Sequence, residues 1–221
     1  MFTTRCAAAA LLISIVAAPA QALVLWDTYL ERTEANSLYT SDTGGQETVQ
    51  RVSFATDVSA TQFSVSGIFF FGDRTFAGPD DFTVNIYADA GGAVGALAQS
   101  VAASGATRSA PGGQLNNSDF LRFDAAFDTA VEIAAGTWWI SVAMDTSGDD
   151  DVWIWAGANV ASERIALRST WGSGAFGTPF ERQMSLLIEG EAAAVPAPPA
   201  IALLGGALGL AGWAARRRRA A

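Results

Sequence analysis

Between residues 23 and 191, apolar and polar residues alternate with a period of two over many short stretches. In one of them, Phe82, Val84 and Ile86 occupy every second position. Successive side chains of a β-strand point to opposite faces, so this pattern predicts half-buried strands. The β-branched and aromatic residues in these stretches favour the same structure. The stretches are 49–55, 62–71, 82–87, 97–103, 120–127, 138–145, 152–155, 164–168 and 183–188.

Turn-forming residues separate the alternating stretches. Several separators are rich in glycine, among them 44–45, 91–92, 111–113 and 172–174. Glycine and proline at such positions favour tight turns. Because no stretch in this region shows a long helical repeat, we predict an all-β domain of about eight to ten short strands. We expect an antiparallel β-sandwich with a jelly-roll-like arrangement.

The first 22 residues have the three parts of a secretory signal peptide. Arg5 supplies a positive charge, residues 7–18 are apolar, and small residues occupy alternate positions at 18–20 and again at 20–22. We therefore expect export through the Sec translocon and favour cleavage by signal peptidase after Ala22. Cys6 precedes the apolar run, so it cannot be the acylation site of a lipoprotein and leaves with the signal peptide.

The C-terminal tail has a second hydrophobic segment. Residues 200–215 are apolar and would form roughly 25 Å of helix. That length is slightly short of a bilayer core of about 30 Å, but local thinning allows it to span. A proline-rich motif precedes it: Val195, Pro196, Ala197 and Pro198. A stop-transfer cluster follows it and marks the cytoplasmic end: Arg216, Arg217, Arg218 and Arg219.

This order of proline motif, short helix and arginine cluster resembles the PEP-CTERM sorting tail of Gram-negative envelope proteins. In that family a membrane-embedded exosortase recognises the tail and cuts near a Pro-Glu-Pro motif. The resemblance covers residues 192–221, and Ala197 stands where the family usually has glutamate. It implies transient anchoring in the inner membrane, followed by delivery to the outer surface or secretion. An ordinary C-terminal membrane anchor is the alternative interpretation.

The predicted domains are therefore a signal peptide (1–22), a β-sandwich ectodomain (23–191) and a sorting tail (192–221). Within the ectodomain, 82–89 and 135–142 are similar to strand pairs of exported PEP-CTERM proteins, most of which have no known function. This second resemblance supports a sandwich and implies no activity. The family resemblance also implies an association with exopolysaccharide and biofilm production.

Composition excludes several kinds of chemistry. The chain has no histidine and no lysine, and its one cysteine lies in the predicted signal peptide. Ser-His-Asp and Cys-His catalysis, the usual zinc and copper sites, and a phosphate-binding loop with lysine are therefore excluded. Residues 23–191 contain 22 acidic residues and eight arginines, a net charge of −14, which repels nucleic acid and anionic lipid. A glycosidase with two carboxylates stays open, although nothing selects a pair.

An acidic loop at 145–151 is the best metal candidate. Its carboxylates belong to Asp145, Asp149, Asp150 and Asp151. Calcium binds six to eight oxygen ligands, of which such a loop can supply several. The loop lacks the closing glutamate of an EF-hand. A solvated hairpin turn, in which aspartate, serine and glycine are favoured for backbone reasons, is the alternative.

Tryptophans are the other candidates for ligand binding: Trp139, Trp153, Trp155 and Trp171. Trp153 and Trp155 share one face of a predicted strand, and flat aromatic faces stack on sugar rings. The alternative is that they fill the core, since Val152 and Ile154 make both faces of that strand apolar.

Three functions follow from these observations. We expect a non-enzymatic envelope or extracellular-matrix protein that is sorted by an exosortase-like membrane protease and needs no cofactor. The second hypothesis is a carbohydrate-binding module for an exopolysaccharide, assisted by calcium. The third is a carboxylate glycosidase.

Overall fold

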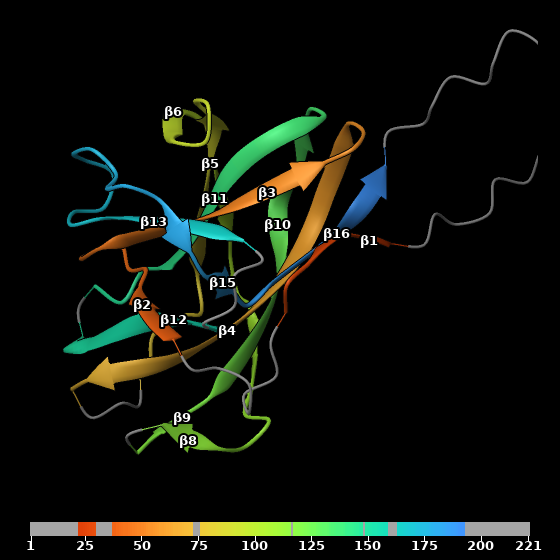
Figure 1. The fold of residues 1–221 in the computed structure, drawn as a ribbon. Helices are drawn as coiled ribbons and strands as arrows, with labels where there is room; N and C mark the ends of the chain where they lie inside the picture. Colours follow the sequence, from red (N-terminus) through yellow and green to blue (C-terminus); the bar gives the residue numbers. More distant parts are fainter. Residues whose placement is uncertain are drawn as a thin grey trace, which may run out of the picture.

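The computed structural model describes residues 22–29, 37–72, 76–115, 117–147, 149–158 and 163–192. In these ranges the chain forms strands and turns and no helix, which confirms the all-β prediction (Figure 1). The strands are β1 (Leu23–Asp27), β2 (Ser37–Thr40), β3 (Glu47–Phe54), β4 (Val58–Phe71), β5 (Phe82–Asp89), β6 (Val94–Ala103), β7 (Thr107–Ser109), β8 (Gln114–Leu115), β9 (Ser118–Asp119), β10 (Leu121–Ile133), β11 (Gly136–Met144), β12 (Asp151–Ala158), β13 (Arg164–Arg168), β14 (Phe180–Glu181), β15 (Gln183–Met184) and β16 (Leu186–Ala192).

Within the described residues, these strands form an eight-stranded sheet, a six-stranded sheet and the small β8–β9 pair. The six-stranded sheet has the order β14-β13-β3-β11-β5-β6. In the larger sheet one path runs β1-β16-β4-β10-β7, and β12 joins β4 to β2 and β15. Strands pair antiparallel throughout both sheets, as the alternating pattern predicted.

The long strand β4 organises the larger sheet. Its first part pairs with β16 and its second part with β12, while β10 follows its other edge. Gly67 lies where β4 meets β12. A Cβ atom there would approach Trp153 Nε1 to 2.5 Å and the Ile154 carbonyl oxygen to 2.6 Å. Glycine is therefore required for the tryptophan to pack against the β4 backbone.

The two sheets pack face to face around an apolar core. Phe82 of the smaller sheet has its ring centroid 5.4 Å from those of both Phe123 and Trp153 and 5.7 Å from that of Phe63, all three in the larger sheet. Each such edge-to-face pair adds about 0.5–1.5 kcal/mol beyond the area that it buries. The core joins inner-face residues of both sheets, so the architecture is sandwich-like.

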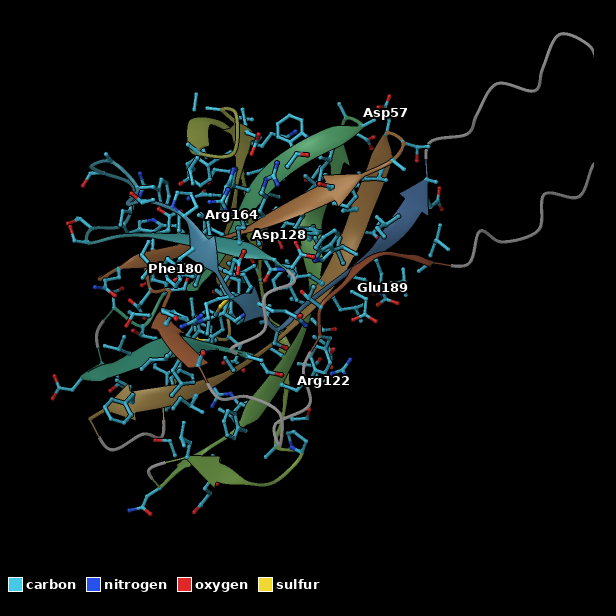
Figure 2. The ribbon with its side chains drawn as sticks, viewed as in Figure 1. Asp57, Arg122, Asp128, Arg164, Phe180 and Glu189 are labelled. Atoms are coloured by element: carbon cyan, nitrogen blue, oxygen red, sulfur yellow. The ribbon has the colours of Figure 1, made fainter. Side chains whose placement is uncertain are left out.

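Charged side chains project from the outer face of the larger sheet. Arg122 on β10 and Glu189 on β16 are two of them (Figure 2). Their neighbours Phe123 and Ile188 point inward and are buried. This alternation is the period of two seen in the sequence.

The first and last described strands lie side by side. Leu23 of β1 pairs with Gly190 of β16, so the two ends of the sandwich domain meet at one sheet edge. Residues 1–21 of the predicted signal peptide, the proline motif and the arginine cluster lie outside the described residues. Among the residues that are described, no helix is long and apolar enough to cross a membrane.

Candidate functional site

A polar network covers the outer face of the six-stranded sheet. Its central strand β11 presents Trp139, Ser141 and Ala143 on this face, while Ile140 and Val142 face the core. The strand lies between β3 and β5. Because serine and alanine are small, side chains from the two flanking strands can meet above them, and both residues are fully buried.

The carboxylate of Glu47 is the centre of this network. Glu47 lies at the start of β3 and has no exposed surface. Its Oε1 accepts hydrogen bonds from the Tyr87 hydroxyl at 2.7 Å and from Asn85 Nδ2 at 3.1 Å. Its Oε2 accepts one from Arg168 Nε at 2.6 Å, and a second guanidinium nitrogen of Arg168 completes an ion pair. A buried charge of this kind is stable because it is both paired and hydrogen-bonded.

Tyrosine 87 links the two charged residues. Its hydroxyl oxygen accepts hydrogen bonds from Arg168 Nη2 at 2.8 Å and from Asn85 Nδ2 at 3.2 Å. Burial raises the pKa of the phenol well above its usual value, and the hydrogen bond and charge of Glu47 raise it further. Tyr87 is therefore a neutral donor at physiological pH, and the network as a whole carries no net charge.

The loop after β13 folds over the network. Phe176 lies against the Arg168 guanidinium, 4.5 Å from ring centroid to Cζ, and meets Tyr87 edge-on at 5.2 Å between ring centroids. Gly172 donates its backbone N–H to Glu47 Oε2 at 3.4 Å. Gly172 and Gly174 have φ angles of 66° and 78°, a left-handed conformation that glycine adopts without strain.

A pocket of about 310 Å³ opens between this loop and the β5–β6 hairpin. Its floor is polar and its sides are largely apolar. The lining residues are Asn85, Tyr87, Val94, Gly95, Leu97, Arg168, Gly172, Gly174, Ala175 and Phe176. We call this cavity the outer-face pocket.

A second ion pair lies beside the network. Asp89 accepts hydrogen bonds from Trp139 Nε1 at 2.9 Å, from Arg51 Nε at 3.2 Å and from the Gly92 backbone at 3.0 Å. Burial alone would raise the pKa of Asp89. The hydrogen bonds from Gly92, Arg51 and Trp139 outweigh burial and hold this pKa below its usual value.

The tryptophans of the predicted sugar-binding surface require a correction. Trp139, Trp153 and Trp155 are fully buried, so none of them presents a face to a ligand. Trp153 and Trp155 stack on each other in the core with ring centroids 6.4 Å apart, as the core-filling alternative proposed. Both faces of β12 are covered, because Ile154 packs into a second apolar cluster. Trp171 is half-buried in the loop beside the outer-face pocket.

The acidic loop adopts local turns. Asp145 Oδ1 accepts the Ser147 backbone N–H at 2.9 Å, and Asp149 Oδ1 accepts that of Asp151 at 3.2 Å. Hydrogen bonds from Ser147 lower the pKa of Asp145. Asp150 is exposed, whereas Asp151 is buried at the start of β12.

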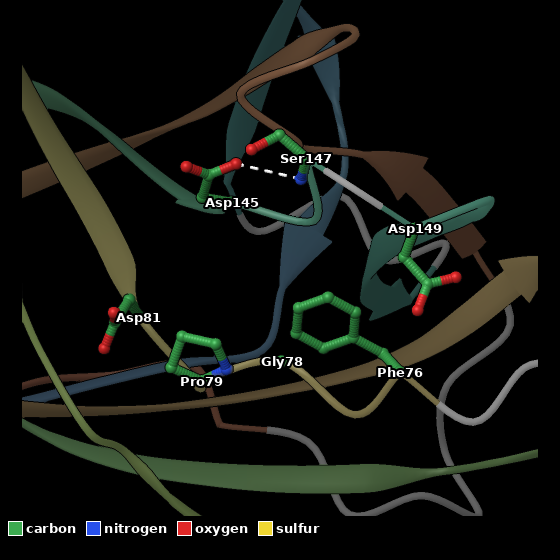
Figure 3. A pocket seen from close by; sticks show the side chains of 7 residues that line it. All are labelled: Phe76, Gly78, Pro79, Asp81, Asp145, Ser147 and Asp149. Atoms are coloured by element: carbon green, nitrogen blue, oxygen red, sulfur yellow. Dashed lines mark hydrogen bonds between the residues drawn. The ribbon is translucent and has the colours of Figure 1, made fainter.

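Two of these aspartates line a pocket of about 230 Å³ together with Phe76 and Asp81 (Figure 3). Nevertheless, in the described part of the chain no three acidic side chains converge so that they could hold a metal ion. The predicted set of Asp145, Asp149, Asp150 and Asp151 is therefore not assembled into one site. The loop is not a hairpin either, because it connects β11 of the six-stranded sheet to β12 of the eight-stranded sheet.

Sequence reasoning did not single out the network residues Glu47, Asn85, Tyr87 and Arg168. A signal was present, because Asn85, Tyr87 and Arg168 occupy the outward positions of strands whose inward positions are apolar. A scan against protein-family models and a search of curated proteins both found no match.

Proposed function

We propose that this chain is an exported, non-enzymatic surface protein whose C-terminal tail is processed by an exosortase-like membrane protease. The observation that carries the proposal is the order of the tail after the domain. Strand β16 ends at Ala192, three residues before the proline motif begins at Val195, and the apolar segment and four arginines follow directly. The apolar segment that follows keeps the cleavage motif close to the membrane surface, and the short connection from β16 keeps the folded domain there as well.

The edge at which the two chain ends meet supports this topology. Leu23, the first residue after the proposed signal-peptidase site, pairs with Gly190 near the end of β16. Both hydrophobic ends of the precursor can therefore occupy the same membrane while the sandwich domain is folded. Signal-peptide removal then leaves the domain attached only by its tail.

A jelly-roll-like arrangement forms part of the proposal. In a jelly roll of eight strands, the sheet orders are first-eighth-third-sixth and second-seventh-fourth-fifth. The orders β2-β12-β4-β10 and β3-β11-β5-β6 support this arrangement, with β2 as the first strand and β12 as the eighth. Jelly rolls occur in many binding and coat proteins, so the arrangement supplies no activity by itself.

The charge of the domain supports release to the outer surface or to the extracellular matrix. Residues 23–191 carry a net charge of −14, which keeps a domain soluble and away from anionic lipid. Transient attachment by the tail, followed by release, suits such a domain better than permanent residence at a membrane.

Intact-mass measurement of the protein from its native host tests the proposal. We expect the dominant species to begin at Leu23 and to end near Pro196–Pro199. Replacing Arg216 to Arg219 with serine should reduce membrane retention and cleavage, because four consecutive arginines oppose translocation. A dominant wild-type species that still ends at Ala221 would refute processing. Unchanged retention and cleavage of the variant would refute the role of the arginines.

A further inference from the structure

The size of the outer-face pocket limits its ligand. Pockets for small molecules measure about 300–1,000 Å³, and this one holds about 310 Å³. It therefore suits a single ring rather than a long or branched molecule. Its floor is held in place by the Glu47 network, so the pocket is formed before any ligand arrives. A preformed pocket lowers the entropic cost of binding.

The charge of the floor points to a neutral ligand. Arg168 already donates to Glu47, to Tyr87 and to the Gly174 carbonyl oxygen. The Arg168 guanidinium is therefore already paired and is a poor binding site for an anionic ligand. Glu47 has no exposed surface and is paired, so a cation would find no accessible carboxylate. Separating this ion pair to bind a charged ligand would leave one buried charge without a partner, which is unfavourable.

One acceptor of the floor remains open. Because a carboxylate only accepts hydrogen bonds, Asn85 must turn its amide nitrogen toward Glu47, and the same nitrogen also donates to Tyr87. The amide oxygen of Asn85 is thereby directed away from Glu47. Within the described residues no group donates to it, and Asn85 lines the pocket. A ligand hydroxyl is a suitable donor.

The sides of the pocket provide apolar contact. Phe176 comes from the loop after β13, and Leu97 comes from β6 on the opposite side. Leu97 is 52% exposed. The other exposed large hydrophobic residues in the described ranges, Leu23 and Val24, lie on the edge strand β1, away from the pocket lining. A ring with an apolar C–H face and polar edges would cover Leu97 and reach Asn85 at the same time.

We propose that the outer-face pocket binds one neutral monosaccharide unit. The C–H face of the sugar ring lies against Leu97 and Phe176, and a sugar hydroxyl donates to the amide oxygen of Asn85. This inference does not depend on the sorting tail. It moves the carbohydrate-binding hypothesis from the buried tryptophans to Asn85, Leu97 and Phe176, which the sequence had not singled out as ligand-binding residues.

Saturation-transfer NMR on the full-length chain in detergent micelles tests this assignment. The probes are the methyl glycosides of glucose, mannose and galactose, with glucuronate and glucosamine as charged comparisons. We expect at least one neutral glycoside to bind at millimolar concentration, and both charged sugars to bind at least about tenfold more weakly. Absence of binding by all three glycosides overturns the proposal, as does equal binding of a charged sugar.

A pair of matched variants then locates the site. Leu97→Ser removes an exposed leucine from the pocket, and Val24→Ser changes a residue of similar exposure, 50%, on β1. We expect Leu97→Ser to weaken glycoside binding about tenfold, the size of effect that follows loss of an apolar pocket contact. Val24→Ser should leave binding unchanged, and both variants should melt within about 2 °C of the wild type. If Leu97→Ser binds as tightly as the wild type, the pocket is not the site.

Discussion

The outer-face network and the acidic loop both concentrate polar and charged side chains, but they satisfy them in different ways. In the network, Glu47 is fully buried and receives hydrogen bonds from Asn85, Tyr87 and Arg168, which belong to two other strands. In the acidic loop, Asp145 and Asp149 each accept a backbone N–H from two residues further along the chain. The loop thus uses local turns, whereas the network uses tertiary contacts.

The difference shows how sequence proximity relates to a shared site. Four carboxylates within seven residues suggested a metal site. However, aspartates in such a loop also accept hydrogen bonds from nearby backbone N–H groups, which forms local turns. The partners of Glu47 are distant in the sequence: Tyr87 lies 40 residues away and Arg168 lies 121 residues away. Only the antiparallel pairing of β13, β3, β11 and β5 brings them onto one face.

The largest effect should come from breaking the network at its cation. Arg168→Met would leave Glu47 buried with its negative charge unpaired. Removal of one partner from a buried ion pair costs about 3–5 kcal/mol, so we expect the free energy of unfolding to fall by that amount. Urea denaturation at neutral pH measures it.

The matched control for Arg168 is Arg122, whose ion pair with Asp124 is 37% and 43% exposed. Solvent screens such a pair, and Arg122→Met should cost about 1 kcal/mol or less. Equal losses in the two variants would contradict the view that Glu47 depends on Arg168 in the interior.

A smaller effect should distinguish the aspartates around the acidic loop. Asp42 is 3% exposed, and its carboxylate accepts hydrogen bonds from Gly44 N at 2.9 Å, from Thr146 Oγ1 at 2.5 Å and from Trp153 N at 3.3 Å. Asp42→Ala leaves the Thr146 hydroxyl and the Trp153 N–H buried without this acceptor, which should cost about 1–3 kcal/mol. Urea denaturation tests this value.

Exposed Asp150 provides the comparison for Asp42. Asp150→Ala should change the free energy of unfolding by no more than about 0.5 kcal/mol. If the two alanine variants were equally stable, the contacts that connect Asp42 to the loop and to β12 would contribute nothing to stability.

Much of the fold could be predicted because a period of two is a local signal. The stretch 62–71 lies within β4 and 120–127 overlaps β10, so long strands with several alternations were found. The short strands β2, β7 and β14 were not predicted, because two to four residues hold too few alternations. Their pairing is set by neighbouring strands rather than by their own pattern.

The candidate site could be predicted only in part. The outward positions of Asn85 and Tyr87 follow from the alternation in β5, but the sequence does not say which strand lies beside β5. Small Ser141 and Ala143 on β11 allow the side chains to meet, and this condition depends on sheet order. Whether the tryptophans were exposed or buried was ambiguous for the same reason. The alternating pattern shows on which face of a strand a side chain lies, but not what packs against that face.

The dependence of stability on pH should separate the two regions further. The pKa of Asp89 is lower in the folded protein than its unfolded value of about 3.9, so its carboxylate stabilises the fold above that pH. This contribution is lost as the pH falls through the folded pKa. Asp89→Asn should therefore be less stable than the wild type at pH 6, and the difference should shrink as the pH falls below about 4.

Asp145 is the comparison for Asp89 because its pKa is also lowered, in this case chiefly by hydrogen bonds from Ser147. Ser147 lies two residues away, and such a local turn persists partly in the unfolded chain. Asp145→Asn should therefore show a smaller pH-dependent difference than Asp89→Asn. Denaturant unfolding of both variants at pH 6, 4 and 2.5 measures these differences in the free energy of unfolding. A larger pH-dependent difference for Asp145→Asn would contradict the distinction between local and tertiary contacts.

The smallest effect expected is that of calcium. A ligand that binds only the folded state stabilises it by about 2.7 kcal/mol at a hundredfold excess over Kd, which would raise the Tm of a domain of this size by about 5–10 °C. The carboxylates of Asp145 and Asp149 are directed to backbone N–H groups, and the described acidic side chains do not converge in threes. We therefore expect the Tm in millimolar calcium to lie within about 1 °C of the Tm in chelator. A rise of several degrees that disappears in Asp149→Asn would mean that the loop rearranges around the ion, and the contrast between a tertiary network and a local turn would then no longer hold.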